Sequence, residues 1–164
     1  MKKTFLLLAM FILAVNLAQG EELKTLGLDD PSSASPKIEA DTQIKTEGKS
    51  SLKITTRWPT TVNLGEVSGL DVENAKLVYS AKVKAELEGE GTAYLEMWVH
   101  LGDAQYFSKG MNDPVRQKTD WKTIRTPFLF EKGQKPDKAT LNLVINGKGT
   151  VWIDEITLSK EPLK

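Results

Sequence analysis

Residues 77 to 87 have an apolar side chain at every odd position, and polar side chains fill all but one of the even positions. Successive side chains of a β-strand point to opposite faces of the sheet, so this segment predicts a strand with one buried face and one solvated face. From Lys37 onward, no window keeps apolar residues at helical spacing. Weaker alternation predicts further strands at 37 to 46, 51 to 57, 60 to 64, 92 to 101, 105 to 109, 121 to 130, 140 to 146 and 150 to 158.

A set of short strands with no helix between them predicts an all-β domain. Each strand has one apolar face that only a second sheet can cover, so we expect an antiparallel β-sandwich, with a closed barrel as the alternative. Turn residues separate the strands. Asn146-Gly147 is typical of a two-residue hairpin turn and predicts that the last two strands pair directly.

The first twenty residues differ from the rest of the chain. Lys2 and Lys3 precede an apolar run from residue 5 to residue 15, and Ala18-Gln19-Gly20 provides small residues for cleavage. The run is too short to span a bilayer, which takes about 20 residues, so residues 1–20 are predicted to be a secretory signal peptide. We expect an exported bacterial protein, periplasmic or extracellular. Residues 21–36 are predicted to be a flexible segment, and residues 37–164 a single sandwich domain.

Composition excludes several classes of protein. The chain of 164 residues has no cysteine and one histidine, and its 22 Lys and Arg balance 22 Asp and Glu. Disulfide frameworks, thiolate nucleophiles and cysteine-based metal centres are therefore excluded. A nucleic-acid partner is not expected, because phosphate binding needs an electropositive surface.

The last predicted strand contains an irregularity. Val151 and Ile153 share one phase, whereas Ile156 and Leu158 share a phase shifted by one residue. A β-bulge at Asp154-Glu155 would return both halves to the same buried face. Such a bulge would direct a carboxylate toward the edge of the sheet.

Four short segments occur in a distinctive order and spacing: GKSSLKI at 48 to 54, LVYSAKVK at 77 to 84, DWK at 120 to 122 and VWIDEITL at 151 to 158. Together they resemble the galactose-binding-like jelly roll found in many carbohydrate-binding modules, and the resemblance extends over residues 37 to 160. It implies a jelly-roll strand order, noncatalytic binding of a sugar, and a structural calcium ion near the sheet edge.

The resemblance places Asp154 at an acidic position that commonly contributes to the calcium site. The implied partners are backbone carbonyls near Lys49 and an acid near the first strand, for which Glu39, Asp41 and Glu47 are the candidates. Calcium takes six to eight oxygen ligands, and the chain has no dense acidic loop that would supply them locally.

A candidate binding surface follows from residues 94 to 101. The odd positions from Leu95 to Leu101 are aliphatic and are expected to face the core, which leaves the even positions outside. In the jelly-roll order this strand lies between 140 to 146 and 105 to 109, with 60 to 64 beyond. Aromatic rings beside amides and carboxylates suit a sugar, whose C–H face stacks on a ring while its hydroxyls form hydrogen bonds. The predicted ligand-binding residues are Tyr94, Glu96, Trp98, His100, Asn142, Asn146, Asn63 and Tyr106.

Several aromatic residues have more than one interpretation. A segment within 102 to 120 could cover Tyr94 and Trp98 and make a second small core. Tyr106 and Phe107 alternate, so only one of them can face the same side as Trp98. Three further tryptophans are interpreted separately: a loop platform or edge packing for Trp58, a core residue for Trp121, and no assignment for Trp152.

Motifs for catalysis are absent from the sequence. It contains no nucleophile elbow, no phosphate-binding glycine-rich loop and no histidine pair for zinc. Glu96 and His100 are four residues apart on one strand, about 13 Å between Cα atoms, which prevents direct proton exchange. A hydrolase or lyase would need a second carboxylate, Asp103 or Asp113, beside Glu96. We therefore expect a noncatalytic carbohydrate-binding protein; the alternatives are an envelope protein-interaction module on the same fold or, less favoured, a polysaccharide hydrolase or lyase.

Overall fold

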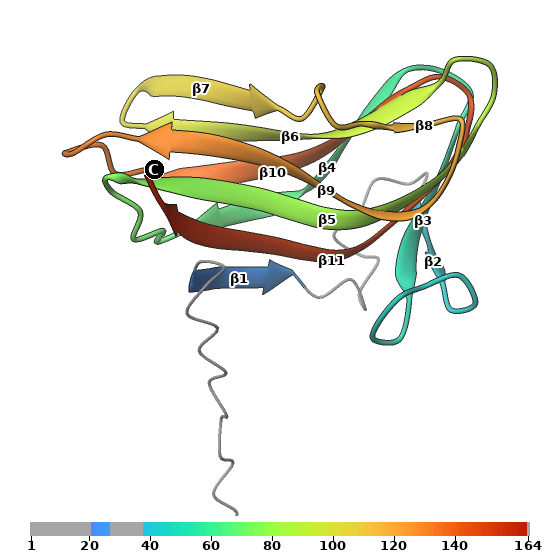
Figure 1. Cartoon of the computed structure of the whole chain (residues 1–164), viewed down its shortest axis with the longest axis horizontal. Helices are drawn as coiled ribbons and strands as arrows, with labels where there is room; N and C mark the ends of the chain where they lie inside the picture. The colour runs from blue at the N-terminus through green and yellow to red at the C-terminus, as the bar shows by residue number, and fades with distance from the viewer. Residues whose placement is uncertain (1–20, 27–37, 164) are drawn as a thin grey trace, which may run out of the picture.

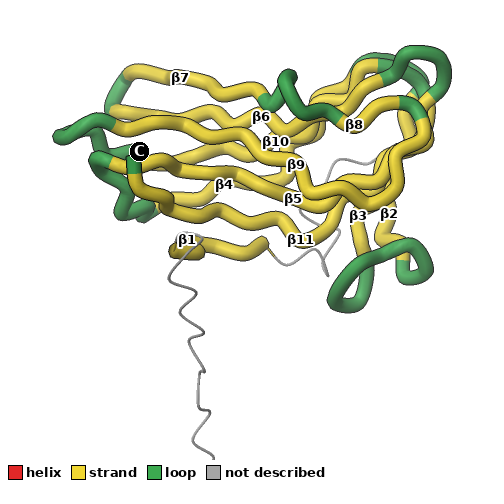
Figure 2. The backbone as a smooth tube through the Cα atoms, in the orientation of Figure 1, coloured by secondary structure: helices red, strands yellow, loops and turns green. Residues whose placement is uncertain are grey.

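The computed structural model describes residues 21–26 and 38–163, and their regular structure consists of β-strands joined by loops (Figure 2). No helix in these two segments is long and apolar enough to cross a membrane. The strands are β1 (Glu21–Leu26), β2 (Ile38–Asp41), β3 (Ser51–Thr56), β4 (Thr60–Ser68), β5 (Ala75–Leu87), β6 (Thr92–Leu101), β7 (Ala104–Lys109), β8 (Val115–Arg116), β9 (Lys118–Phe130), β10 (Lys138–Asn146) and β11 (Gly149–Pro162).

The strands form two antiparallel sheets that lie face to face (Figure 1). Sheet A has the order β2-β3-β11-β5-β9, and β1 pairs with the far half of β11. Sheet B has the order β4-β10-β6-β7, and β8 pairs with the start of β6. The predicted sandwich is confirmed, as is the order expected for the strands of sheet B, and the closed-barrel alternative is wrong.

The core lies between the two sheets and is built from the alternating positions that the sequence pattern singled out. On β6, Leu95, Met97 and Val99 have no exposed surface, and Tyr79 and Val83 of β5 are equally buried opposite them in sheet A. Burying one such large apolar side chain stabilises a fold by about 1.5 to 3 kcal/mol. The alternation therefore fixes which face of each sheet remains outside.

The predicted bulge in β11 is present. Pairing with β5 shifts register between Asp154 and Thr157, and Glu155 adopts a positive φ of 47°. On both sides of the bulge the apolar side chains reach the core, from Val151 and Ile153 to Ile156 and Leu158, each at most 1% exposed. The extra residue thus returns the second half of the strand to the buried face.

The strand predicted over 37 to 46 is shorter in the structure. β2 ends at Asp41, whose Oδ1 accepts hydrogen bonds from the backbone N–H groups of Gln43 and Ile44, both at 2.9 Å. A side-chain carboxylate that accepts from the following backbone turns the chain and competes with sheet pairing. Residues 42 to 50 consequently form a loop between β2 and β3 (Figure 2).

The prediction of a flexible segment over residues 21–36 is wrong for its first part, because Glu21–Leu26 forms strand β1. β3 pairs with β11 only as far as Ile153, whereas β1 pairs with Ile156 to Lys160. β1 therefore supplies partners for backbone groups that β3 does not reach, a tertiary effect that local composition does not show. The predicted signal peptide and residues 27–36 lie outside the described residues.

The Asn146-Gly147 pair does not form the expected hairpin, because β10 and β11 belong to different sheets. A type I′ hairpin turn needs positive φ at both central residues, but only Gly147 has one, at 140°. Gly147 and Gly149 instead allow close contact between backbone segments. A Cβ at Gly149 would lie 2.2 Å from the carbonyl oxygen of Glu86, so the crossing between sheets requires glycine.

Candidate functional site

The outward face of sheet B brings together most of the predicted binding residues. Antiparallel pairing aligns them in rows across the strands, and in the rows of Trp98 and Glu96 strand β6 lies between β10 and β7. Trp98 is opposite Thr140 on one side and Phe107 on the other. The next row contains Glu96 in the same position between Asn142 and Lys109, with Asn63 of β4 beyond Asn142.

Glu96 is the centre of a hydrogen-bond network on this face. Its Oε1 accepts from Trp98 Nε1 at 2.8 Å and from Asn142 Nδ2 at 3.0 Å, and its Oε2 lies 3.1 Å from Lys109 Nζ. Asn63 Nδ2 extends the network by donating to Asn142 Oδ1 at 3.2 Å. Side chains from all four long strands of sheet B are thereby joined.

The surroundings of Glu96 favour its ionised form. Burial by itself raises the pKa of this carboxyl, because only 6% of the residue is exposed. Hydrogen bonds from Asn142, Trp98 and Lys109, together with the charge of Lys109, outweigh burial and hold the pKa of Glu96 below its usual value. The network therefore contains a carboxylate with a strong acceptor role.

Trp98 and Phe107 form an aromatic pair on this face. Their ring centroids are 5.2 Å apart with planes tilted by 52°, and Lys109 Nζ lies 5.0 Å from the Phe107 centroid. Trp98 is partly exposed and Phe107 is 56% exposed. Of the two residues that a segment within 102 to 120 could cover, Trp98 keeps exposed surface, and residues 104–109 form β7 beside β6.

Tyr106 was predicted as a ligand-binding residue, but it lies on the other side of the sheet from Trp98. It is paired with Val99, which faces the core, and its ring packs near Phe128 of β9 with centroids 6.3 Å apart. Phe107 takes the position on the outer face instead. Sequence alternation showed that only one of the two could do so, and the register between β6 and β7 decided which. Lys109, on the same parity as Phe107, was missed for the same reason.

Tyr94 lies on the predicted face but offers little surface. Tyr94 is 8% exposed, as is Val144 opposite it on β10. This row therefore offers a ligand less accessible surface than the row of Trp98. Asn146 and Asn63 are both exposed. Asn146 lies in a row of its own at the end of β10, opposite Thr92 and away from the Glu96 network.

His100 lies at the opposite end of the face from Asn146. Its Nε2 is 3.4 Å from Thr140 Oγ1, and Thr140 donates to Glu66 Oε1 at 2.9 Å. Lys138 also pairs with Glu66, at 2.9 Å. This second polar group borders Trp98 on the side away from Glu96 and is composed of a hydroxyl, an imidazole and an ion pair.

The three remaining tryptophans lie elsewhere. Trp58 is 71% exposed on the loop between β3 and β4, which excludes edge packing. Trp121 is only partly buried and is not part of the core, so the prediction of a core residue is wrong. It lies where β9 shifts register against β5. Trp152 is buried on the outer face of sheet A, and its Nε1 donates to Asp41 Oδ2 at 2.9 Å.

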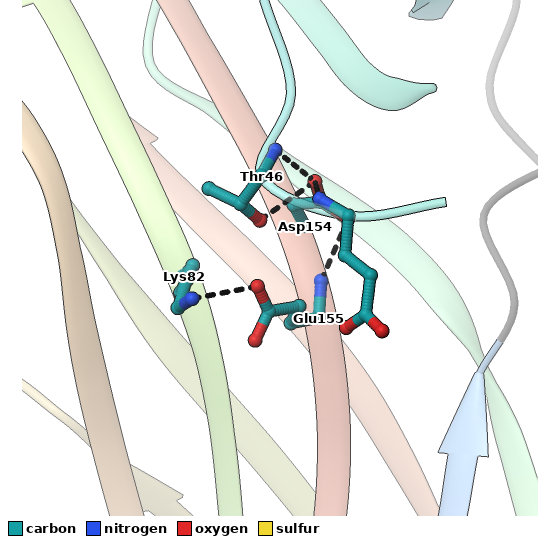
Figure 3. Close-up of polar contacts among 5 residues, drawn as sticks. Thr46, Lys82, Asp154 and Glu155 are labelled. Carbon is teal, nitrogen blue, oxygen red and sulfur yellow. Dashed lines mark hydrogen bonds and ion pairs between the residues drawn. The ribbon is translucent and has the colours of Figure 1, made fainter. Parts of the chain in front are cut away.

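Asp154, the predicted calcium ligand, anchors the loop between β2 and β3 (Figure 3). Its Oδ2 accepts from Thr46 N at 2.7 Å, Thr46 Oγ1 at 2.9 Å and Glu47 N at 3.2 Å. Its Oδ1 accepts from Glu155 N at 2.9 Å, and Glu155 pairs with Lys82 at 2.6 Å.

These donors fit a calcium ion poorly. Calcium needs converging oxygen atoms, whereas the groups that converge on Asp154 are N–H and O–H donors. The candidate Asp41 is likewise occupied by Gln43, Ile44 and Trp152. Lys49, Glu39 and Glu47 are exposed, and within residues 21–26 and 38–163 no three acidic or histidine side chains group closely enough to hold a metal.

Comparison with solved structures identifies the fold as that of the β-sandwich carbohydrate-binding modules. The CBM22-1 xylan-binding domain of Paenibacillus barcinonensis Xyn10C superposes with a TM-score of 0.59 at 16% identity, over 88% of this chain and 97% of that one. The xylan-binding CBM22 domain formerly called x6b gives 0.58 at 11% identity, over 90% and 99%. At these identities the similarity concerns the fold.

The same fold also occurs in a catalytic setting. The enzymatically active domain of tailspike protein 4 from bacteriophage CBA120 gives a TM-score of 0.53 at 6% identity, over 77% of this chain and 18% of that one. No family model matches the sequence, and no curated protein matches it either. Function must therefore be argued from the residues of the site.

Proposed function

We propose that the protein binds carbohydrate noncatalytically on the outward face of sheet B, with Trp98 and Phe107 as the stacking surface. The observation that carries the proposal is this pair of rings, partly exposed on a sheet face and bordered by polar groups. Aromatic rings stack on the C–H face of a pyranose. Adjacent amides and hydroxyls accept hydrogen bonds from the sugar hydroxyls and donate hydrogen bonds to them.

The polar groups beside the rings support this assignment. The exposed Asn63 borders the pair on one side, joined to the Glu96 network through Asn142, which is itself only 7% exposed. Thr140 with His100 borders the pair on the other side. The charges on this part of the face are paired, Lys109 with Glu96 and Lys138 with Glu66. The similarity of the fold to two xylan-binding domains agrees with a glycan ligand.

The state of Glu96 argues against its acting as the acid of a glycoside hydrolase. A glycoside hydrolase needs one carboxyl group whose pKa is raised so that it can donate a proton, and a second carboxylate nearby. The network at Glu96 lowers its pKa, and Lys109, Trp98 and Asn142 occupy its oxygens. Glu96 is thus held as an acceptor.

Affinity electrophoresis against a panel of soluble polysaccharides tests the proposal. We expect at least one glycan to retard the wild-type protein, and Trp98→Ala to lose at least tenfold in affinity for it. Trp58→Ala is the matched control, because it removes the same side chain from the loop that precedes Thr60. Thr60 pairs with Ile145, about 17 Å along β10 from the Thr140 partner of Trp98. The control variant should bind as wild type does. Unretarded wild type across the panel, or equal losses in both variants, would refute binding at this face.

We also propose that the protein is exported, on the strength of its N-terminal sequence. Expression of the full chain in a bacterium, followed by fractionation and mass spectrometry, tests this. We expect a periplasmic or secreted product that begins at Glu21. A product retaining residues 1–20 in the cytoplasm would contradict export and leave the binding proposal unaffected.

A further inference from the structure

Glu96 presents a problem of charge burial. It is a carboxylate on a surface strand, yet only 6% of the residue is exposed. A buried charge is costly unless it is paired and fully hydrogen-bonded, so a residue of this kind needs several fixed partners. Those partners show what Glu96 does on this face.

Protein donors occupy most of the acceptor capacity of Glu96. A carboxylate has about four lone-pair positions and no proton to donate. Trp98 Nε1 and Asn142 Nδ2 share Oε1, at 2.8 and 3.0 Å, and Lys109 Nζ is 3.1 Å from Oε2. Little acceptor capacity is left for a sugar hydroxyl.

The hydrogen bond from Trp98 Nε1 to Glu96 determines how Trp98 can contact a ligand. The indole has a single donor, Nε1–H, and Glu96 accepts it. Trp98 therefore offers a ligand its ring surface alone. The Nε1 bond and the tilted contact with Phe107 together hold the ring in one orientation. Holding a side chain in its binding orientation beforehand avoids the entropy cost of ordering it on binding.

We propose that Glu96 is a positioning residue that fixes the orientation of the Trp98 indole and does not itself contact the glycan. The inference rests on the proposed function. It assigns direct contact to the rings of Trp98 and Phe107, and it makes the Glu96 carboxylate part of the support behind them.

A double-mutant cycle separates this role from direct contact. Trp98→Phe keeps an aromatic ring but removes the donor to Glu96. Affinity for the glycan that binds wild type best should fall about fivefold in Glu96→Ala, whereas Glu96→Ala added to Trp98→Phe should cost less than twofold. Glu96→Gln retains a carbonyl acceptor and should recover most of the affinity. An equal loss from Glu96→Ala in both backgrounds would mean that Glu96 contacts the glycan, and would overturn the inference.

A second measurement does not require a ligand. In a 1H–15N spectrum, the indole resonance missing from Trp98→Phe identifies the Trp98 Nε1–H. We expect Glu96→Ala to shift this resonance and to speed its exchange with water, with the other indole resonances unchanged. An unaltered resonance would show that Glu96 does not position the ring. If wild type binds no glycan, the proposed function fails, and this spectrum still decides whether Glu96 holds the indole.

Discussion

At the scale of single residues, the outer face of sheet B depends on how buried polar groups are satisfied. Glu96 is buried with three protein partners, whereas the hydroxyl of Tyr79, fully buried in the core, has no hydrogen-bond partner among the described residues. Burial raises the pKa of Tyr79, so the phenol remains neutral. The two residues lead to opposite expectations for substitution.

Removing the Tyr79 hydroxyl should stabilise the protein. A buried polar group without a partner costs about 1 to 3 kcal/mol, and Tyr79→Phe keeps the ring that fills the core. We expect the free energy of unfolding in urea to rise by about 1 kcal/mol. A decrease would show that the hydroxyl has a partner, such as a buried water molecule.

The ionisation of Glu96 predicts a dependence of stability on pH. Its pKa is lowered in the folded protein, so its contribution is fully present above the unfolded value of about 4.3 and is lost as pH falls through the folded value. The difference in unfolding free energy between wild type and Glu96→Gln should therefore be constant from pH 7 to about pH 5 and shrink at lower pH. A difference that grows on acidification would contradict the assigned direction.

At the scale of elements, the crossings between the sheets require close backbone approach. Both Gly149, where β11 begins, and Gly89, in the loop between β5 and β6, have positive φ, of 142° and 58°. A Cβ at Gly149 would meet the carbonyl oxygen of Glu86 at 2.2 Å, whereas a Cβ at Gly89 meets nothing within 4 Å. The two positions share a backbone constraint and differ in available space.

Alanine substitutions at these glycines should differ in cost. Gly89→Ala bears only the backbone strain, about 1 to 2 kcal/mol. Gly149→Ala adds a collision with the backbone of β5 and should cost about 3 kcal/mol or more, which denaturant unfolding would measure. Equal losses in the two variants would mean that the strands separate easily at this crossing.

At the scale of the whole molecule, a domain without cysteine depends on its core and on the loops that anchor to it. The loop of residues 42 to 50 is anchored to sheet A through Asp154 and Asp41. Protein donors thus occupy the carboxylate that the resemblance assigns to calcium. The loop is held by hydrogen bonds to buried or partly buried acids.

Thermal melting distinguishes this anchoring from a metal site. We expect the same midpoint in excess calcium and in excess chelator, and a midpoint lower by several degrees for Asp154→Asn in both conditions. Asp154 accepts with both oxygens, one from Thr46 and Glu47 and the other from Glu155, whereas an amide has a single acceptor oxygen. Asp71→Asn, at an exposed position, serves as the control. A lower midpoint for wild type in chelator would instead support a structural calcium ion.

The sequence by itself determined most of the strands, the two-layer sandwich, the parity of β6 and the bulge at Asp154-Glu155. Each of these depends on the order of apolar and polar side chains along one strand, which burial between two sheets then enforces. The segment that became β2 and its loop was predicted too long, because Asp41 turns the chain by a local hydrogen bond that alternation does not register.

Only the tertiary structure decided which groups meet across strands that are distant in sequence. The register of β7 against β6 placed Phe107 beside Trp98 and Tyr106 against Phe128. The fold also brought Thr46 to Asp154, more than a hundred positions away along the chain. Such pairings depend on how separate strands align in space, and the alternation within a single strand is the same for every alignment of its partners.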